Sequence, residues 1–158
     1  MTKISLHLFL LMLSLPPAYA LQEGQSAPAC KPISQMSQQQ ADGKVLLIDF
    51  WATWCAPCLK SMPFFNSLYN ELNQKGFEIV AVNVDEDSEI ARQFLKNRPV
   101  SYPVSFDPQG ECPKTFEVKA MPSSYLIDKR GIMRKIHLGY RDGDQATLRE
   151  AIETLLKE

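Results

Sequence analysis

Two cysteines separated by two residues form the part of the sequence best suited to chemistry. Cys55 and Cys58 follow a continuous apolar run, Val45 to Phe50, and precede a segment with helical periodicity. Such a pair can hold a metal, form a structural disulfide, or cycle between a dithiol and a disulfide. A zinc site needs four ligands, commonly supplied as two such pairs. The other cysteines, Cys30 and Cys112, are single and far apart in the sequence, so no metal site is predicted.

The cysteine pair is expected at the junction between a buried strand and a helix. The run from Val45 to Phe50 has the length and apolar composition of a strand buried on both faces. A helix is expected from about Pro57 to Gln74, kinked at Pro63. Its apolar face holds Met62, Phe65, Leu68, Tyr69 and Leu72. Because the free N–H groups at a helix N-terminus stabilise a thiolate, this position favours a redox-active pair over a purely structural disulfide.

The rest of the chain has the alternation of strands and helices that is typical of an α/β domain. A strand is expected at 77–85, which completes a right-handed parallel strand–helix–strand unit. A hairpin around the turn at 128–131 makes the predicted central sheet mixed. The remaining predicted elements are a helix at 88–97, a strand at 103–106, and helices at 111–118 and 144–158. The residues expected to face inward from the first of these helices are Ile90, Phe94 and Leu95.

The first twenty residues are predicted to form a secretory signal peptide. Lys3 gives a positive start, a mostly apolar stretch runs from Ile4 to Leu15, and Ala18-Tyr19-Ala20 provides a small-x-small cleavage site. The alternative is an uncleaved membrane anchor, but the apolar stretch is too short to span a bilayer comfortably. The prediction is cleavage after Ala20, which leaves residues 21–158 as a single domain that begins with a polar N-terminal arm.

Charge and compartment narrow the classes of function. The formal net charge of −1 gives no sign of a nucleic-acid surface. An exported protein meets an oxidising environment, so the four cysteines are expected to take part in disulfide chemistry. The sequence therefore predicts a periplasmic or otherwise extracytoplasmic protein whose redox-active disulfide needs no bound cofactor.

Two segments resemble the active site of the thioredoxin superfamily. "DFWATWCAPC", which ends at Cys58, resembles the segment with the redox-active cysteines; "MPSSYLID", which begins at Met121, resembles the segment with the facing cis-proline. The stretch between Asp85 and Pro122 is longer than the compact thioredoxin core needs. With the predicted export signal, the chain is similar to the TlpA/ResA group of extracytoplasmic thiol–disulfide reductases. The resemblance implies a thioredoxin fold, a mixed central sheet flanked by helices, with a TlpA-type insertion before the cis-proline.

The resemblance assigns roles to residues of the first segment. Cys55 matches the attacking cysteine, and Cys58 matches the cysteine that resolves the mixed disulfide. Trp54 matches the tryptophan beside the active site. Together with Ala56 and Pro57, this tryptophan is expected to contact the client protein.

Further roles fall outside the cysteine motif. Pro122 matches the cis-proline, and the backbone of Met121 is expected to pair with the client chain. Asp49 matches the buried aspartate of thioredoxin; an apolar strand should raise its pKa and suit it to relay the proton of the resolving cysteine. Glu86 matches an acid near the active site of ResA-like proteins. The alternative for Glu86 is an exposed acidic loop at 85–87.

The function implied by the resemblance is the reduction of disulfides in client proteins. In an oxidising compartment this requires an electron donor, for which the resemblance implies a membrane thiol–disulfide transporter of the DsbD/CcdA type. The implied clients are secreted thiols, such as the haem-attachment cysteines of apocytochrome c or the cysteines of copper sites. Two alternatives stay open. One is an oxidase or isomerase, distinguished by its reduction potential, and the other is a Cu(I)-handling binding module.

Cys30 and Cys112 are predicted to form a second, structural disulfide. The exported chain has an even number of cysteines, and two free thiols beside a redox site would be a liability. The bond would pin the N-terminal arm to the stretch before the cis-proline. The alternatives are two buried free thiols, or an intermolecular bridge through one of them.

Overall fold

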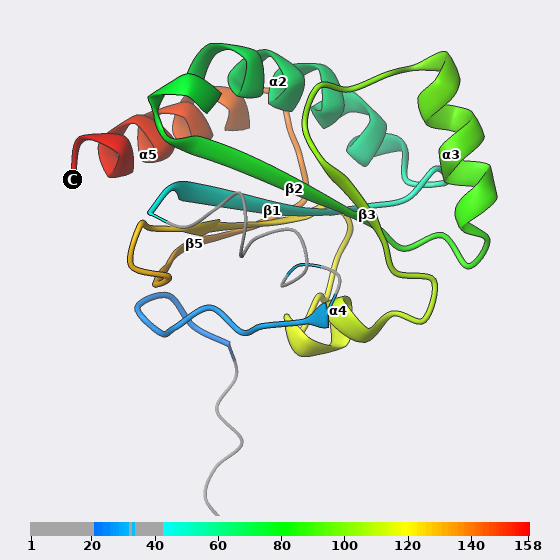
Figure 1. Cartoon of the computed structure of the whole chain (residues 1–158), viewed down its shortest axis with the longest axis horizontal. Coiled ribbons are helices and arrows are strands. Elements are labelled where there is room, and N and C mark those ends of the chain that lie inside the picture. Colours follow the sequence, from blue (N-terminus) through cyan, green and yellow to red (C-terminus); the bar gives the residue numbers. More distant parts are fainter. Residues whose placement is uncertain (1–20, 32, 34–42) are drawn as a thin grey trace, which may run out of the picture.

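A mixed sheet of five strands lies at the centre of the molecule (Figure 1). The computed structural model describes residues 21–31, 33 and 43–158; the predicted signal peptide and positions 32 and 34–42 of the N-terminal arm lie outside these residues. The strands are β1 (Val45–Trp51), β2 (Phe77–Asn83), β3 (Val104–Phe106), β4 (Ser123–Ile127) and β5 (Met133–Leu138). Their order is β3-β2-β1-β4-β5. The pairs β1–β2 and β2–β3 are parallel, whereas β4 runs antiparallel to both β1 and β5.

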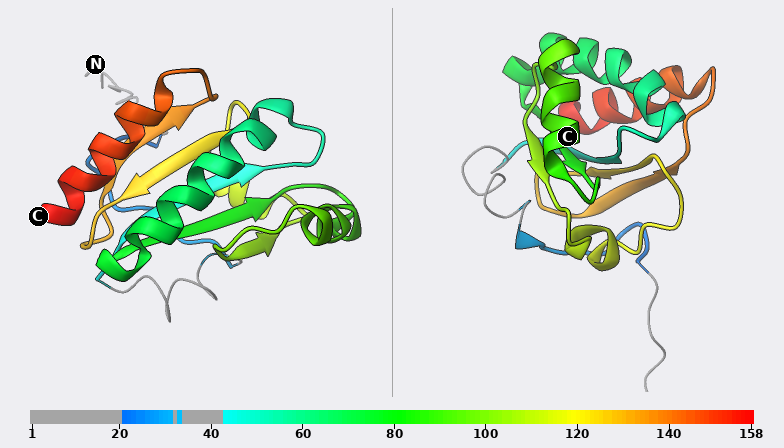
Figure 2. Two further views of the ribbon diagram at one scale, coloured as in Figure 1. Left: turned by 90° about the horizontal axis from the view of Figure 1, so that it is seen from above. Right: turned by 90° about the vertical axis from the view of Figure 1, so that its right-hand side faces the viewer.

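Helices cover both faces of this sheet. They are α2 (Ala56–Leu72), the 3-10 helix η1 (Asn73–Lys75), α3 (Ser88–Asn97), α4 (Glu111–Thr115) and α5 (Asp144–Lys157). Helices α2 and α5 lie on one face, while α4 and residues 21–31 lie on the other (Figures 1 and 2). Helix α3 flanks the end of the sheet that carries β3. None of the helices in the described part of the chain is both long enough and apolar enough to cross a membrane.

The sheet separates two apolar clusters, and β1 contributes to both. All seven residues of β1 are buried, as are all seven of β2, which confirms a strand covered on both faces. Leu47 packs with Phe65 of α2 on one side, and Phe50 packs with Tyr125 on the other. Removing a side chain of this size from water contributes roughly 1.5–3 kcal/mol. Two buried faces therefore hold the strand that leads directly into the cysteine motif.

The helix that follows the cysteines ends as its sequence predicts. It continues through Pro63 to Leu72, and η1 carries the helical turns to Lys75. Gly76 ends the helical turns. Its φ of 94° is a left-handed conformation that glycine adopts without a steric penalty. The next strand can then begin at Phe77 and pair with β1.

Two details of the predicted elements are wrong. Ile90 was expected to face inward on α3, but it is 54% exposed, and the buried residue is Ala91. Ala91 shares a helix face with Phe94 and Leu95, since residues three and four positions apart lie on one side. The short helix predicted to reach residue 118 ends at Thr115 because the chain turns into the left-handed region two residues later, at a φ of 50°.

The stretch between Asp85 and Pro122 holds α3, β3 and α4. Strand β3 belongs to the central sheet, while α4 covers the opposite face from α2 (Figure 1). The interpretation of this stretch as a TlpA-type insertion stays a prediction.

Candidate active site

Cys55 and Cys58 form a disulfide at the N-terminus of α2. Their Cα atoms are 5.3 Å apart. Cys55 is the N-cap residue, and its sulfur accepts a hydrogen bond of 3.3 Å from the backbone N–H of Cys58. Ala56 and Pro57 open the helix, where proline loses no hydrogen bond because the first N–H groups have no helical partner. The same N–H groups would stabilise a thiolate on Cys55 when the disulfide is reduced.

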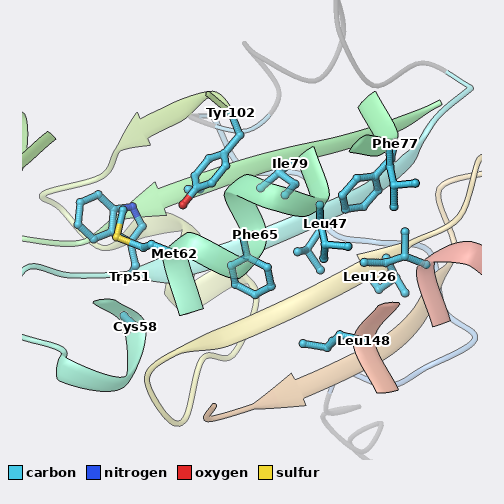
Figure 3. Close-up of a cluster of buried hydrophobic side chains, with 14 of the residues drawn as sticks. Leu47, Trp51, Cys58, Met62, Phe65, Phe77, Ile79, Tyr102, Leu126 and Leu148 are labelled. Carbon is cyan, nitrogen blue, oxygen red and sulfur yellow. The ribbon is translucent and has the colours of Figure 1, made fainter. Parts of the chain in front are cut away.

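The two cysteines differ in their surroundings. Cys58 is completely buried, in the cluster that also contains Trp51 and Met62, whereas Cys55 retains slight exposure at the helix end. Figure 3 shows Trp51 and Met62 together at the end of the cluster where Cys58 lies. A partner molecule therefore meets Cys55 first, and Cys58 can react only from inside the fold.

The surface beside Cys55 is apolar. Trp54 precedes it and is 67% exposed, which makes it one of three large apolar side chains that are exposed in the described part of the chain. Ala56 is exposed and Pro57 is half-buried. These side chains form a surface that a client protein can cover, since aromatic residues contribute strongly to protein contacts.

The Met121–Pro122 peptide bond is cis, as predicted for this segment. Pro122 is buried directly before β4, and its carbonyl accepts a 2.8 Å hydrogen bond from the N–H of Gly139. Met121 is half-buried and packs against the cluster that holds Cys55 and Cys58. The structure therefore brings the two segments that resemble thioredoxin to one site.

Asp49 is a buried acid in the middle of β1. It is 2% exposed, and the hydroxyl of Ser124 on β4 donates a 2.7 Å hydrogen bond to its Oδ1. Burial raises the pKa of Asp49 to about 7, and the Ser124 bond acts in the opposite direction. The carboxyl group can therefore take up or release a proton near neutral pH.

Asp85 is a site residue that the sequence did not reveal. From the sequence, the acidic loop at 85–87 could be a stretch exposed to solvent, but Asp85 is only 4% exposed. Its carboxylate accepts hydrogen bonds from the N–H of Thr53 at 3.0 Å, from the hydroxyl of Thr53 at 2.9 Å, and from the amide of Asn83 at 2.7 Å. These bonds fix the backbone two residues before Cys55 to the end of β2. The acidic run conceals this role, because only the pairing of β1 with β2 brings Thr53 to Asp85.

Glu86, the other acid assigned by resemblance, has an exposed side chain in the loop between β2 and α3. No ion pair among the described residues includes it. The next residue, Asp87, caps α3 by accepting a 2.9 Å hydrogen bond from the N–H of Glu89. The three acids of the loop therefore differ in role: Asp85 binds Thr53, Glu86 faces solvent and Asp87 caps α3.

A second disulfide joins Cys30 to Cys112. The Cα atoms are 5.3 Å apart, and both residues are buried in the cluster on the α4 side of the sheet. Asp107 accepts a 2.7 Å hydrogen bond from the N–H of Cys112 and so holds the start of α4. The residues near the N-terminal end of the described chain are therefore tied to the segment that leads to Met121.

Metal ligands do not gather in the described residues: they contain no group of three or more His, Cys, Asp or Glu side chains placed to hold an ion.

The sequence of this chain matches a known protein family. The model of the family described as Redoxin matches residues 19–152. The chain belongs to the Redoxin family. Among curated proteins, it is similar to the thiol-disulfide oxidoreductase ResA of Bacillus thuringiensis subsp. konkukian (strain 97-27), with 39% identity over 117 residues. The match covers 73% of this chain and 64% of ResA, so the chain spans less than two thirds of that relative's length.

Solved structures extend the similarity to the fold. A protein from Chlorobium tepidum, assigned as thiol:disulfide interchange protein DsbE, is 37% identical with a TM-score of 0.80, covering 87% of this chain and 99% of that protein. The exposed lipoprotein thioredoxin Etrx1 from Streptococcus pneumoniae strain TIGR4 is 27% identical with a TM-score of 0.63, covering 73% and 88%. Together with the mixed five-stranded sheet, these similarities confirm the predicted thioredoxin fold. They also confirm the resemblance to ResA-like proteins of the thioredoxin superfamily.

Proposed function

We propose that the protein is a thiol–disulfide oxidoreductase that reduces disulfides in extracytoplasmic client proteins. The observation that carries this proposal is the Cys55–Cys58 disulfide at the N-terminus of α2, where Cys55 caps the helix with 4% of its surface exposed and Cys58 is completely buried. The similarity to ResA and to the assigned DsbE supports the same chemistry. The exposed Trp54, with Met121 packed against the cluster that holds Cys55, would supply the surface on which a client lies.

The reaction begins with reduced protein. The Cys55 thiolate attacks one sulfur of a client disulfide, and the client's S–S bond breaks as the Cys55–client bond forms. The released client sulfur leaves as a thiolate and takes up a proton from solvent. The N–H of Cys58 and the first turn of α2 stabilise the attacking thiolate beforehand.

Resolution completes the transfer. Cys58 gives its proton to the Asp49 carboxylate and attacks the sulfur of Cys55, which breaks the mixed disulfide. The second client sulfur leaves as a thiolate and takes up a proton from solvent, and Asp49 returns the proton of Cys58 to solvent. Two electrons have then passed from the protein to the client, and the Cys55–Cys58 disulfide remains on the protein.

Turnover in an oxidising compartment needs a source of electrons. The reductase would receive them from a membrane thiol–disulfide transporter of the DsbD/CcdA type, by exchange at the same disulfide. Clients whose thiols must stay reduced for haem attachment or copper binding fit this direction of transfer. The predicted export signal at 1–20 and the exposed lipoprotein relative support an extracytoplasmic site of action.

The test is an insulin-reduction assay with dithiothreitol as the electron source. The protein is expected to accelerate insulin precipitation, Cys55→Ser to abolish the acceleration, and Cys58→Ser to trap a mixed disulfide visible on a non-reducing gel. A second assay supplies oxidised protein to reduced, unfolded ribonuclease A. Rapid disulfide transfer to ribonuclease with no insulin reduction would replace the reductase proposal with the oxidase alternative.

A further inference from the structure

Ser124 is a buried residue whose hydroxyl takes no direct part in the thiol–disulfide exchange of Cys55 and Cys58. We propose that Ser124 is a positioning residue for disulfide exchange: its hydroxyl holds the Asp49 carboxyl in the ionised form that accepts the proton of Cys58. The inference rests on the proposed function, because it concerns the resolving step. It goes further in assigning control of that step to a residue outside the cysteine motif.

Asp49 and Ser124 form a buried hydrogen bond between neighbouring strands. Asp49 and Ser124 face each other directly across the antiparallel pair β1–β4. The Ser124 Oγ donates to the Asp49 Oδ1 at 2.7 Å, and both residues are 2% exposed. A short hydrogen bond from a neutral donor stabilises a carboxylate more than a neutral carboxyl group, and a dry environment strengthens it.

The other groups around Asp49 offer little compensation for its charge. Its partner across the parallel pair β1–β2 is Ala81, which carries no polar side chain. Side chains alternate along a strand, so Asp49 lies on the same face of β1 as Leu47 and Trp51, the face that α2 covers. The buried members of the cluster on that face that can ionise are Tyr102 and, once the disulfide is reduced, Cys55 and Cys58. No ion pair among the described residues includes Asp49.

Tyr102 is a second side chain affected by the charge of Asp49. Its side chain is buried in the cluster with Cys58 and Trp51, and its hydroxyl points toward the end where Trp51 lies (Figure 3). Burial, and then the nearby charge of Asp49, raise the pKa of Tyr102. The phenol therefore stays protonated at neutral pH and does not compete with Asp49 for the proton of Cys58. Ser124 is left as the side chain whose hydrogen bond favours an ionised Asp49.

The position of Ser124 in the chain couples the acid to the client-binding segment. Ser124 lies two residues after Pro122, at the start of β4. A client that pairs with the backbone of Met121 would press on the same strand that carries the Ser124 hydroxyl. The hydrogen bond thus connects the segment that receives the client to the group that receives the proton.

The experiment measures the ionisation of Asp49 directly, by carboxyl carbon NMR across pH in the oxidised protein. Ser124→Ala is expected to raise the pKa of Asp49 by about one unit, since a hydrogen bond to a charged group is lost. Ser123→Ala is the matched control, because the Ser123 hydroxyl is bonded to the carbonyl of Ala120 at 2.7 Å and not to Asp49. It should leave the pKa of Asp49 unchanged.

Two further variants of equal size, Ser124→Thr and Ser124→Val, separate the loss of the hydrogen bond from a change in packing. Ser124→Thr keeps the hydroxyl and Ser124→Val replaces it with a methyl group, so only the valine variant should raise the pKa of Asp49. The pH at which resolution of the mixed disulfide reaches half its maximal rate should rise with it by the same amount, about tenfold in proton concentration. In an Asp49→Asn background, Ser124→Ala should no longer shift this pH.

The outcomes separate the inference from the proposed function. A folded Ser124→Ala or Ser124→Val protein with an unshifted Asp49 pKa would overturn the role of Ser124, even if insulin is still reduced. A shifted Asp49 pKa in a protein that reduces no insulin would support the pairing and refute the reductase. A shift of equal size in Ser123→Ala would also overturn the inference, because it would trace the effect to the strand and not to the hydrogen bond.

Discussion

The division of labour between Cys55 and Cys58 follows from one backbone turn. Cys55 caps α2, with an N–H donor at its sulfur, while Cys58 is enclosed one turn later. The sequence alone predicts this asymmetry, because an apolar strand followed by a helix start leaves the first cysteine at the end of the helix. Depth in the fold then separates Cys55, the proposed nucleophile, from Cys58, the proposed resolving thiol.

The asymmetry predicts the order of alkylation. In the reduced protein, iodoacetamide is expected to label Cys55 before Cys58, and to do so at a lower pH than it labels an unstructured cysteine peptide, because the helix N-terminus favours the thiolate. Mass-spectrometric mapping of the labelled peptides measures the order. Faster labelling of Cys58 would reverse the assigned roles.

Asp49 makes a second prediction, about stability and pH. Its pKa is about 7 in the folded protein against 3.8 in the unfolded chain, so between these values the folded state binds one more proton. Stability therefore falls as pH rises from about 4 to about 7, by about 4 kcal/mol in total. Relative to Asp49→Asn, the wild type should lose this amount of unfolding free energy between pH 4 and pH 8.

Urea unfolding at each pH measures the difference for Asp49. Glu86→Gln is the control, since that side chain is exposed and its removal should leave the pH dependence of the wild type intact. Parallel stability curves for the wild type and Asp49→Asn would show that Asp49 titrates in the folded protein as it does in the unfolded chain.

The site residues that sequence reasoning found and missed differ in one respect. Asp49 could be predicted because its apolar neighbours along the strand already imply burial. Asp85 and Ser124 could not, because their partners are 32 and 75 positions away in sequence. Strand pairing alone brings Asp85 to Thr53 and Ser124 to Asp49, and neither register is written in local composition.

Among the helices and strands, the predicted burial is correct for strands that are buried on both faces and wrong for a helix that is buried on only one narrow face. The wholly apolar strands β1 and β2 leave one consistent interpretation. Helix α3 packs one narrow face at the edge of the sheet, so Ile90 could point outward while the small Ala91 took the buried position. Hydrophobicity alone does not rank two adjacent apolar residues when a helix covers so little of the core.

The Cys30–Cys112 disulfide joins two short segments on the same side of the sheet. Helix α4 has only five residues, and residues 21–31 have a single isolated β-bridge, between Ser26 and Ile132, in the described part of the chain. Closing a loop of 82 positions contributes about 4 kcal/mol in the chain-entropy model. The double substitution Cys30→Ala with Cys112→Ala is therefore expected to lower the unfolding free energy by up to that amount.

Peptide mapping under non-reducing conditions checks the bond itself. A cross-linked peptide containing Cys30 and Cys112 should survive mild reduction that opens Cys55–Cys58. Insulin reduction by the double alanine variant, below its melting temperature, is expected to persist. Two alkylatable thiols at these positions in the native oxidised protein would contradict the pairing.

The direction of electron flow is a property of the whole molecule. A thermodynamic cycle links the reduction potential to the difference in folding stability between the oxidised and reduced proteins, since 30 mV corresponds to about 1.4 kcal/mol. The helix N-terminus at Cys55 stabilises the reduced form through its thiolate. The burial of Cys58 and of Asp49 opposes this by disfavouring additional charge inside the fold. The balance decides between a reductase and an oxidase.

A reductase requires that balance to favour the oxidised form. The potential, measured by equilibration with glutathione or dithiothreitol buffers, is expected at about −200 mV or lower. Against a strong oxidant near −120 mV, this difference of about 80 mV corresponds to almost 4 kcal/mol of relative stability. By the same cycle, the stability of the oxidised form minus that of the reduced form, measured by urea unfolding, should exceed the same difference in such an oxidant by about this amount. A potential near −120 mV, with the reduced protein more stable than the oxidised one, would assign the chain to disulfide donation.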